Sequence, residues 1–271
     1  MTLSEAEIWR RYDDDEQRLS APVSERMLAL AGARPGLRVL DIATGRGEPA
    51  LRAAQRVAPG GHVLGTDRSG DMLAFARERA SRAGIDNLGL QVADAETLEG
   101  VPERAFDVAL CRWGLMYVGQ PRCALAAIGR RLVPGGLFVA ATWAEPARVS
   151  YWSMPRDVLA RHATLPPVDF ALPGPFHFAD TARLRADLTS EGFAPEHEEE
   201  MTTPVMEADA PAGLIAWCEA FGLARLLEGQ PAGVRDAWRR DMTAQAEHFR
   251  DADGFYRLGG VTRLVAARLR D

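Results

Sequence analysis

The chain has 271 residues, of which 47% are hydrophobic and 26% are charged. This balance is typical of a soluble globular protein with a full core, built as one large domain or as one domain with a cap. The net charge of −6 argues against a nucleic-acid-binding protein, because nucleic-acid surfaces usually need a net basic face.

The cysteines and the N-terminus bear on location and metal content. Cys111, Cys123 and Cys218 stand too far apart for a zinc or iron–sulfur ligand set, and their small number indicates a reducing compartment. The N-terminal segment is polar, and no run approaches the roughly 20 apolar residues that span a bilayer. We therefore expect a cytoplasmic monomer or homodimer that has no membrane contact.

The first half of the chain alternates short apolar runs with helical patterns. The runs predict strands at residues 37–42, 62–66, 88–93, 106–111 and 136–141. Apolar residues at three- and four-residue spacing predict helices at residues 48–57, 69–83 and 122–132. This alternation implies parallel strands joined by right-handed crossovers.

The second half changes its pattern. Residues 146–175 are irregular and rich in proline, residues 179–190 predict a helix, and residues 208–249 are mostly helical. Further strands are predicted at residues 197–205 and 256–269. We expect an α/β fold with a seven-stranded sheet, mostly parallel, whose last strand is antiparallel. Its core is assigned to residues 1–143, including an N-terminal helical segment, with 179–205 and 255–271, and a helical substrate lid to 144–178 and 206–254.

Residues 37–51, LRVLDIATGRGEPAL, are the most informative stretch. A strand that carries Asp41 near its end is followed by the turn Gly45–Gly47 and a helix start. Such a turn places a nucleotide at the end of a parallel sheet. Its glycines let the backbone approach a ligand where a Cβ atom would collide.

Further acids follow the next two strands. Asp67 stands 20 residues after Gly47 and can accept both hydroxyls of a ribose. Asp94 can accept from the exocyclic amine of an adenine, while Ala95 supplies a backbone amide. Each acid alone could equally form a turn or cap a helix. Their joint placement favours an adenosine ligand.

A dinucleotide fold is the closest competitor, since Gly45-x-Gly47-x-x-Ala50 matches its fingerprint. Asp41 and Pro49 argue against this reading, because a carboxylate beside the turn would repel a pyrophosphate. A sulfonium compound with an α-amino group is cationic and suits Asp41.

At these positions the chain resembles the class I S-adenosylmethionine-dependent methyltransferases. VLDIATGRGE is similar to their first motif, GTDRS to their second-strand acid and VADAETL to their adenine-side motif, while FDVALCRWGLMYV and RRLVPGGLFVAATW resemble their later strand motifs. The similarity runs from about Trp9 to Trp143 and more faintly beyond. It is closest to the small-molecule branch of ubiquinone/menaquinone-type and natural-product enzymes, and it implies a Rossmann-like fold with S-adenosyl-L-methionine as cofactor.

The resemblance also implies site residues. The cofactor-binding candidates are Asp41, Ala43, Thr44, Gly45 and Gly47 on the methionine portion, Asp67, Arg68 and Met72 on ribose and adenine, Asp94, Ala95 and Glu96 on adenine, and Cys111 and Arg112 below the sulfonium. The family usually has glycine where this chain has Ala43. Trp9 and Tyr12 resemble aromatic residues that close over the cofactor, and a plain packing role is equally open.

Methyl transfer is an in-line displacement in which positioning contributes on the order of 7–11 kcal/mol. A hydroxyl acceptor benefits from a general base, and His177 is the first choice; packing beside Phe176 is the alternative. His162 and His248 are weaker candidates. Arg112 stands where metal-assisted chemistry would want a carboxylate, so we expect no metal.

The aromatic-rich lid favours an apolar acceptor, aromatic or polyketide-like. The substrate-binding candidates are Tyr12, Trp113, Met116, Tyr117, Trp143 and Trp152. We expect O-methylation of a small molecule, with no nucleic-acid partner. N- or C-methylation, a non-methylating cyclisation or rearrangement, and simple cofactor sensing stay open.

Overall fold

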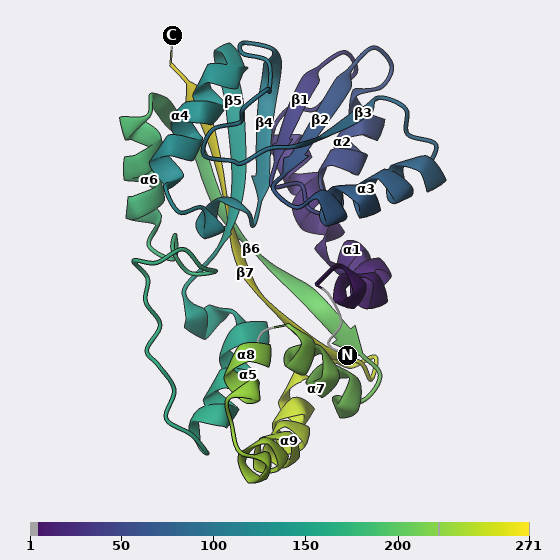
Figure 1. Cartoon of the computed structure of the whole chain (residues 1–271), viewed down its shortest axis with the longest axis vertical. Helices are drawn as coiled ribbons and strands as arrows, with labels where there is room; N and C mark the ends of the chain where they lie inside the picture. Colours follow the sequence, from purple (N-terminus) through teal and green to yellow (C-terminus); the bar gives the residue numbers. More distant parts are fainter. Residues whose placement is uncertain (1–4, 222, 271) are drawn as a thin grey trace. The chain divides into compact units, whose positions relative to one another are not determined.

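The computed structural model describes residues 5–221 and 223–270, and it divides into two compact units (Figure 1). The sheet unit comprises Ala21–Trp143, Phe170–Met201 and Thr262–Asp271. The helical unit comprises Met1–Ser20, Ala144–Asp169 and Thr202–Val261. Three elements run from one unit into the other: α1 (Glu5–Leu30), β6 (Phe193–Ala208) and β7 (Tyr256–Leu269).

The sheet has seven strands in the order β3-β2-β1-β4-β5-β7-β6. Its other members are β1 (Arg38–Ile42), β2 (His62–Asp67), β3 (Leu88–Val92), β4 (Phe106–Arg112) and β5 (Leu132–Trp143). Strands β3, β2, β1, β4 and β5 are parallel, and β7 runs antiparallel to β5, with Trp143 opposite Thr262. The predicted Rossmann-like sheet is therefore confirmed.

Alternation along β5 places apolar side chains on both faces of the sheet unit. Leu137, Val139 and Ala141 face a cluster with the second part of α1 and with α2 (Ala50–Val57). Phe138 points the other way, and its ring lies 5.8 Å from that of Phe193. Both faces are buried, as expected for a mainly parallel sheet.

The remaining helices of the sheet unit begin at predictable caps. The hydroxyl of Ser69 accepts from the N–H of Met72 to start α3 (Gly70–Arg82). Asp180 accepts from the N–H of Ala182 to start α6 (Thr181–Ser190). Helix α4 (Pro121–Arg131) begins with proline at its first turn, where the missing N–H costs nothing.

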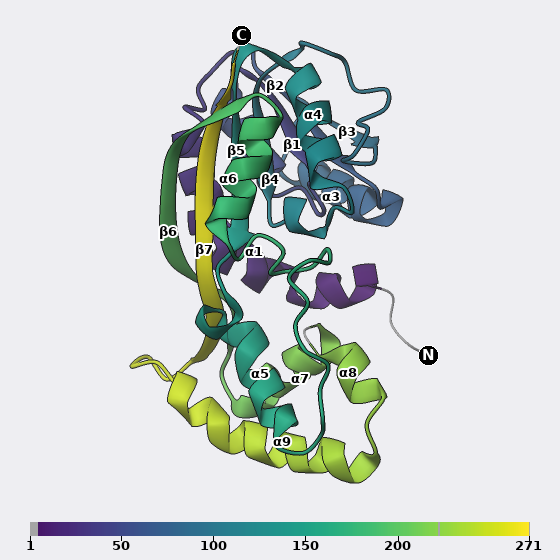
Figure 2. The ribbon, with the colours of Figure 1, turned by 90° about the vertical axis from the view of Figure 1, so that its left-hand side faces the viewer.

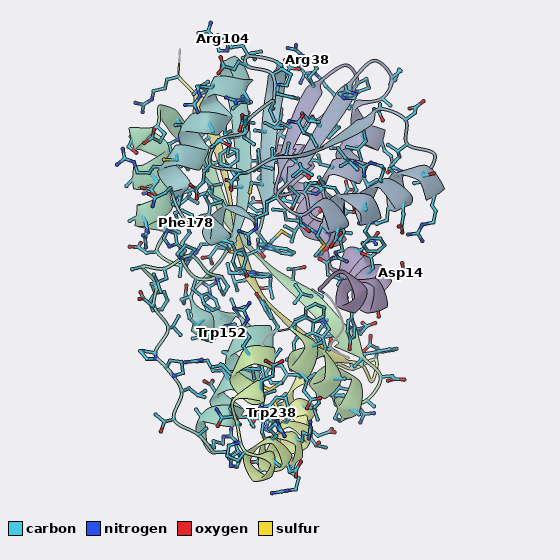
Figure 3. All side chains as sticks on the ribbon, viewed as in Figure 1. Asp14, Arg38, Arg104, Trp152, Phe178 and Trp238 are labelled. Carbon is cyan, nitrogen blue, oxygen red and sulfur yellow. The ribbon has the colours of Figure 1, made fainter. Side chains whose placement is uncertain are left out.

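The helical unit contains α5 (Ser150–Ala160), α7 (Pro211–Ala220), α8 (Ala224–Glu228) and α9 (Ala232–Ala246). The prediction of irregular structure over 146–175 was wrong for α5, which carries Pro155 inside it. Packing explains the difference: fully buried Trp238 of α9 donates its indole N–H to the carbonyl of Pro155, at 2.9 Å (Figure 3). Within the described residues no helix has an apolar stretch long enough to cross a membrane.

Candidate active site

The predicted acids gather at one edge of the sheet because β1 to β5 are parallel and end there. Asp41 is the penultimate residue of β1, Asp67 ends β2, and Asp94 follows β3 by two residues. Strand β4 ends at Arg112. The carboxyl edge of a parallel sheet is where this class of fold binds ligands.

Asp41 is fully buried and only half satisfied. Its Oδ2 atom accepts from the hydroxyl of Thr44 at 2.6 Å and from the N–H of Ala50, at the start of α2, at 3.1 Å. Its Oδ1 atom is buried and has no hydrogen-bond partner among the described residues. Burial raises the pKa of Asp41 to about 7, against the lowering effects of Thr44 and of the positive charge on Arg112, while Glu48 raises it slightly.

The turn after β1 consists of left-handed backbone. Ala43, Gly45 and Gly47 have φ angles of 55°, 54° and 94°. The N–H of Thr44 donates to the carbonyl of Thr66 at 2.9 Å, which fixes the turn to β2. A Cβ atom built on Gly45 would meet no heavy atom of the described residues within 4 Å, so the backbone there is open to a ligand.

Asp67 links β2 to this turn. Its Oδ2 accepts from the N–H of Gly45 at 2.9 Å, and its Oδ1 accepts from the N–H of Ser69 at 2.8 Å. Each oxygen keeps a lone pair that can accept a hydrogen bond from a hydroxyl group. Arg68 is exposed and Met72 is half-buried in the first turn of α3.

Asp94 and Glu96 organise the loop after β3. The Oδ1 of Asp94 accepts from the N–H of Glu96 at 2.7 Å, and the Oε1 of Glu96 accepts from the N–H of Gln120 at 2.9 Å. Ala95 lies half-buried between them. Asp94 thus forms a local turn, one of the two roles open from the sequence, and it is exposed enough to serve the other as well.

Cys111 and Arg112 support the end of β4. Burial raises the pKa of the Cys111 thiol to about 12, and its sulfur accepts from the N–H groups of Gly114 and Leu115. Cys111 is therefore a neutral thiol that holds a turn. Arg112 donates to the hydroxyl of Ser24 at 3.2 Å.

Trp113 is held on several sides. Its backbone has a φ angle of 54°, and its N–H donates to the carbonyl of Ala141 at 2.9 Å. Its ring stacks on that of Trp143 at 4.5 Å and 12°, and its indole N–H donates to Thr262 at 3.3 Å. The guanidinium of Arg112 lies 4.8 Å from the ring centroid. Trp143 itself is buried, so the indole pair forms a rigid wall at the carboxyl ends of β4 and β5.

The loop that carries His177 is joined to the turn after β4. That turn is the short 3₁₀ helix η1 (Leu115–Tyr117), and the carbonyl of Met116 accepts from the N–H of Gly174 at 2.9 Å. Met116 is buried and Tyr117 is exposed.

His177 has one satisfied and one unsatisfied ring nitrogen. Its Nδ1 lies 3.1 Å from the carbonyl of Leu172, which can only accept, so Nδ1 carries the proton. Its Nε2 is buried without a partner among the described residues. Burial lowers the pKa of His177 from its ordinary value, which keeps the imidazole neutral. Its ring meets Phe178 edge-on at 4.8 Å, so packing and a free lone pair coexist here.

Tyr12 and Trp152 belong to the helical unit. The ring of Tyr12 lies 5.5 Å from that of Phe221, and the guanidinium of Arg156 lies 5.0 Å from the ring of Trp152. The side chain of Trp9 is outside the described side chains. Roles for these aromatic residues at the acceptor remain predictions.

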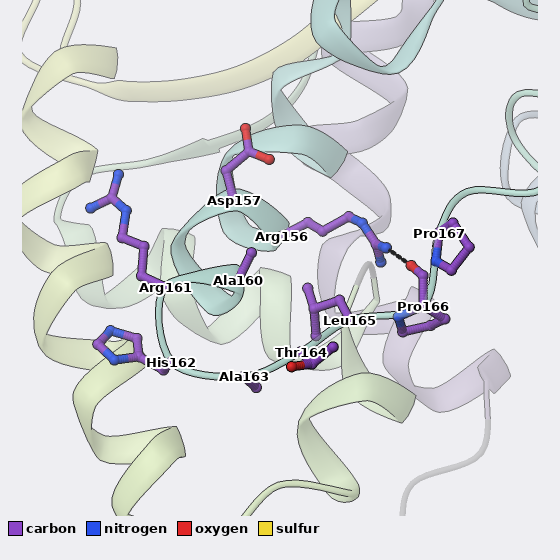
Figure 4. A pocket seen from close by; sticks show the side chains of 10 residues that line it. All are labelled: Arg156, Asp157, Ala160, Arg161, His162, Ala163, Thr164, Leu165, Pro166 and Pro167. Carbon is purple, nitrogen blue, oxygen red and sulfur yellow. Dashed lines mark hydrogen bonds between the residues drawn. The ribbon is translucent and has the colours of Figure 1, made fainter.

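A hollow of about 580 Å³ lies at the end of α5, lined by residues 156, 157 and 160–167 (Figure 4). Three of its polar side chains have partners: Arg156 donates to the carbonyl of Pro166, Arg161 donates to Gln245 at 3.2 Å, and His162 pairs with Asp241 at 2.8 Å. The hollow is built within the helical unit and contains none of the predicted cofactor residues.

Arg79 is a residue that the sequence analysis missed. It donates to the carbonyl of Arg46, in the glycine turn, at 2.6 Å and pairs with Glu48 at 3.2 Å, with both side chains buried. The helical pattern of α3 could have revealed it, because Arg79 occupies the same buried face as Leu73 and Ala76, where an apolar residue is expected. A buried arginine beside a ligand turn is a sign that the turn is being held in place.

These residues fit an S-adenosylmethionine molecule. The unpartnered Oδ1 of Asp41 suits a cationic amine, the open backbone at Gly45 admits close approach, and Asp67 has lone pairs for a ribose. The fit rests on atoms that the fold leaves unsatisfied or uncovered.

Comparison with known proteins supports the same cofactor class. A family model described as a methyltransferase domain matches residues 33–164. The demethylmenaquinone methyltransferase of Thermus thermophilus is 35% identical over 150 residues, 54% of this chain and 67% of that protein. The chain belongs to the class I S-adenosylmethionine-dependent methyltransferases. Its cofactor is accordingly S-adenosylmethionine.

Other methyltransferases extend the comparison. Nocamycin O-methyltransferase of Saccharothrix syringae is 27% identical over 256 residues, 87% of this chain and 88% of that protein. The chain spans about half the length of several other curated relatives. The structure of the [4+2]-cyclase SpnF has a TM-score of 0.59 at 20% identity, covering 94% of this chain and 82% of that one. At that identity it shows the shared fold.

Proposed function

We propose that this methyltransferase transfers a methyl group to an oxygen atom of a small, largely apolar metabolite, with His177 as general base. The observation that carries the proposal is the unpartnered Nε2 of a neutral, buried imidazole. Its loop is hydrogen-bonded to the turn at the carboxyl end of β4. One relative of similar length is named nocamycin O-methyltransferase.

The exposed side chains around this loop support an apolar acceptor. Among the described residues, five large hydrophobic side chains are exposed, and three of them are Tyr117, Phe170 and Leu172. They flank the Met116–Gly174 hydrogen bond in the chain. Exposed apolar groups that gather near a site mark the approach of an apolar ligand.

The bound cofactor supplies a methyl carbon activated by its sulfonium. In the proposed step, Nε2 of His177 accepts the proton of the acceptor hydroxyl as its oxygen bonds to the methyl carbon. The carbon–sulfur bond breaks, its electron pair stays on sulfur, and S-adenosylhomocysteine leaves. The Leu172 carbonyl holds the Nδ1 proton throughout, so the ring enters the reaction as a base at Nε2.

The test uses methyl-labelled S-adenosylmethionine with a panel of phenols, enols, amines and carboxylic acids. We expect labelled product from a hydroxyl acceptor, and we expect His177→Gln to lower kcat at least 100-fold while S-adenosylhomocysteine still binds. His197→Gln is the matched control, since His197 pairs with Glu199 on β6. Cofactor binding with no turnover in the wild type would contradict an enzymatic role.

Two other outcomes select the alternatives. Label found on nitrogen or carbon, unaffected by His177→Gln, would replace the O-methylation proposal with N- or C-transfer. Consumption of a substrate without release of S-adenosylhomocysteine would favour a non-methylating cyclisation, the activity named for SpnF. The assignment of residues 144–178 and 206–254 to a substrate lid belongs to the same proposal.

A further inference from the structure

The ends of β1 and β4 each carry a non-glycine residue in left-handed backbone. Ala43 follows β1 with a φ angle of 55°, and Trp113 follows β4 with a φ angle of 54°. Residues with a side chain rarely adopt this backbone conformation, and it persists only where the surroundings enforce it. The two residues therefore point to a constraint shared by the two strand ends.

Gly114 connects them. A Cβ atom built on Gly114 would lie 2.6 Å from the Cβ of Ala43 and 3.0 Å from the sulfur of Cys111. The backbone of Gly114 has φ −103° and ψ −45°, which any residue can adopt. Glycine is needed at 114 for space rather than for conformation, because the methyl group of Ala43 occupies that space.

The contact bears on the indole wall, because Trp113 directly precedes Gly114. Trp113 itself has three contacts: a backbone hydrogen bond to Ala141, ring stacking on Trp143 and a side-chain hydrogen bond to Thr262. The methyl group of Ala43 adds a fourth contact to this turn, on Gly114, and links the end of β1 to the end of β4. Without it, a gap would open beside Gly114, and the strained backbone of Trp113 would be free to relax.

We propose that Ala43 is a positioning residue whose methyl group, packed on Gly114, holds Trp113 in its stacked place on the acceptor side. The acceptor part of this inference rests on the proposed function. The position of the indole ring does not, and it can be measured without any substrate.

The test exchanges the methyl group between the two positions. The variants are Ala43→Gly, Gly114→Ala and the double variant, which keeps the total volume constant. The electronic transitions of two indole rings 4.5 Å apart couple, and this coupling contributes a band to the circular-dichroism spectrum. The band is assigned as the part of the spectrum that disappears in Trp143→Phe. We expect Ala43→Gly and Gly114→Ala each to lower its amplitude at least twofold, and the double variant to restore most of it.

Arg104→Gly is the matched control. Arg104 also has a positive φ angle, 48°, but it is exposed just before β4, at the same end of the sheet as Arg38, where the parallel strands begin (Figure 3). It should leave the coupled band unchanged. An unchanged band in Ala43→Gly would overturn the proposal, and that variant decides the matter alone if Gly114→Ala fails to fold.

A second readout separates positioning from general packing. Ala43→Gly should raise the ratio of the KM of an acceptor found in the panel to the Kd for S-adenosylhomocysteine at least fivefold. A purely structural role would lower the melting temperature and move neither the coupled band nor this ratio. If the wild type bound no S-adenosylhomocysteine, the proposed function would fail, while the band would still report on Ala43.

Discussion

The carboxylate of Asp67 accepts a hydrogen bond from the backbone N–H of Gly45, at 2.9 Å, and so joins the end of β2 to the glycine turn after β1. The acid predicted to bind the ribose therefore also shapes the loop that is predicted to bind the methionine portion. Its second oxygen is tied to Ser69 at the start of α3. Loss of this carboxylate should disturb both ends of the cofactor site.

Asp67→Ala should weaken S-adenosylhomocysteine binding at least 100-fold, since it removes the ribose acceptor and the anchor of Gly45 together. The affinity of Asp67→Asn should lie between those of the wild type and Asp67→Ala, because its amide group can replace only one of the two accepting oxygens. Titration calorimetry measures both, with the melting temperature as a control for folding. Affinity retained in Asp67→Ala would contradict the ribose assignment.

Cofactor affinity should depend on pH through Asp41. Burial raises the pKa of Asp41 from 3.8 to about 7, so the folded protein holds a proton at pH values where the unfolded chain has lost it. A cationic amine beside Oδ1 needs the ionised carboxylate. The Kd for S-adenosylhomocysteine should therefore fall as pH rises, by about tenfold per unit below pH 7, and level off above it.

The same shift has a consequence for stability without ligand. Between pH 4 and 7 the folded state binds more protons than the unfolded state, so the free energy of unfolding should decrease as pH rises through that range. Asp41→Asn should flatten both profiles, whereas Asp94→Asn, on an exposed side chain, should retain them. A pH-independent Kd in the wild type would argue against contact between Asp41 and the amine.

Removing Arg79 alone should destabilise the protein more than removing Arg79 and Glu48 together. Arg79→Met removes the buried partner of Glu48 Oε1, leaves only the half-buried Arg52 on Oε2, and should cost up to about 3 kcal/mol in the free energy of unfolding. The double variant Arg79→Met with Glu48→Met should recover much of that loss. Denaturant unfolding measures it, with the exposed Arg82→Met of the same helix as control.

The rate should have an acid limit set by His177. Burial lowers the pKa of His177 below 6.5, so Nε2 keeps its lone pair into mildly acidic solution. We expect kcat/KM for a hydroxyl acceptor to begin its acid fall at a lower pH than it would with an ordinary imidazole, because burial lowers the pKa of His177. Because the folded pKa is the lower one, acid should also destabilise the wild type below pH 6.5, and His177→Gln should remove that contribution.

Most of the sheet follows from local sequence, because each buried parallel strand is an apolar run ended by glycine or an acid. The boundaries that differ have physical causes. β6 starts at Phe193 rather than His197, since its glutamates hide the alternation, and α5 is hidden by Pro155. Packing against Trp238, distant in the chain, stabilises that helix.

The residues of the site likewise fall into those that the local sequence predicts and those that depend on tertiary contacts. Asp41, Asp67 and Asp94 are predictable because their places depend only on where strands end. The contact of Ala43 with Gly114 and the insertion of Arg79 under the glycine turn are not, because each depends on how distant elements meet. His177 could be nominated by residue type, yet its free nitrogen is a property of the folded loop.

Strand β6 forms one edge of the sheet beside β7 (Figure 2), and consecutive glutamates in its first half are ion-paired to neighbouring helices. Glu198 pairs with Arg185 of α6, and the next residue, Glu199, pairs with Arg26 of α1. Exposed ion pairs are individually weak and are screened by salt. Amide hydrogens of this half-strand should therefore exchange earlier than those of β1 or β4, and the difference should widen at high ionic strength.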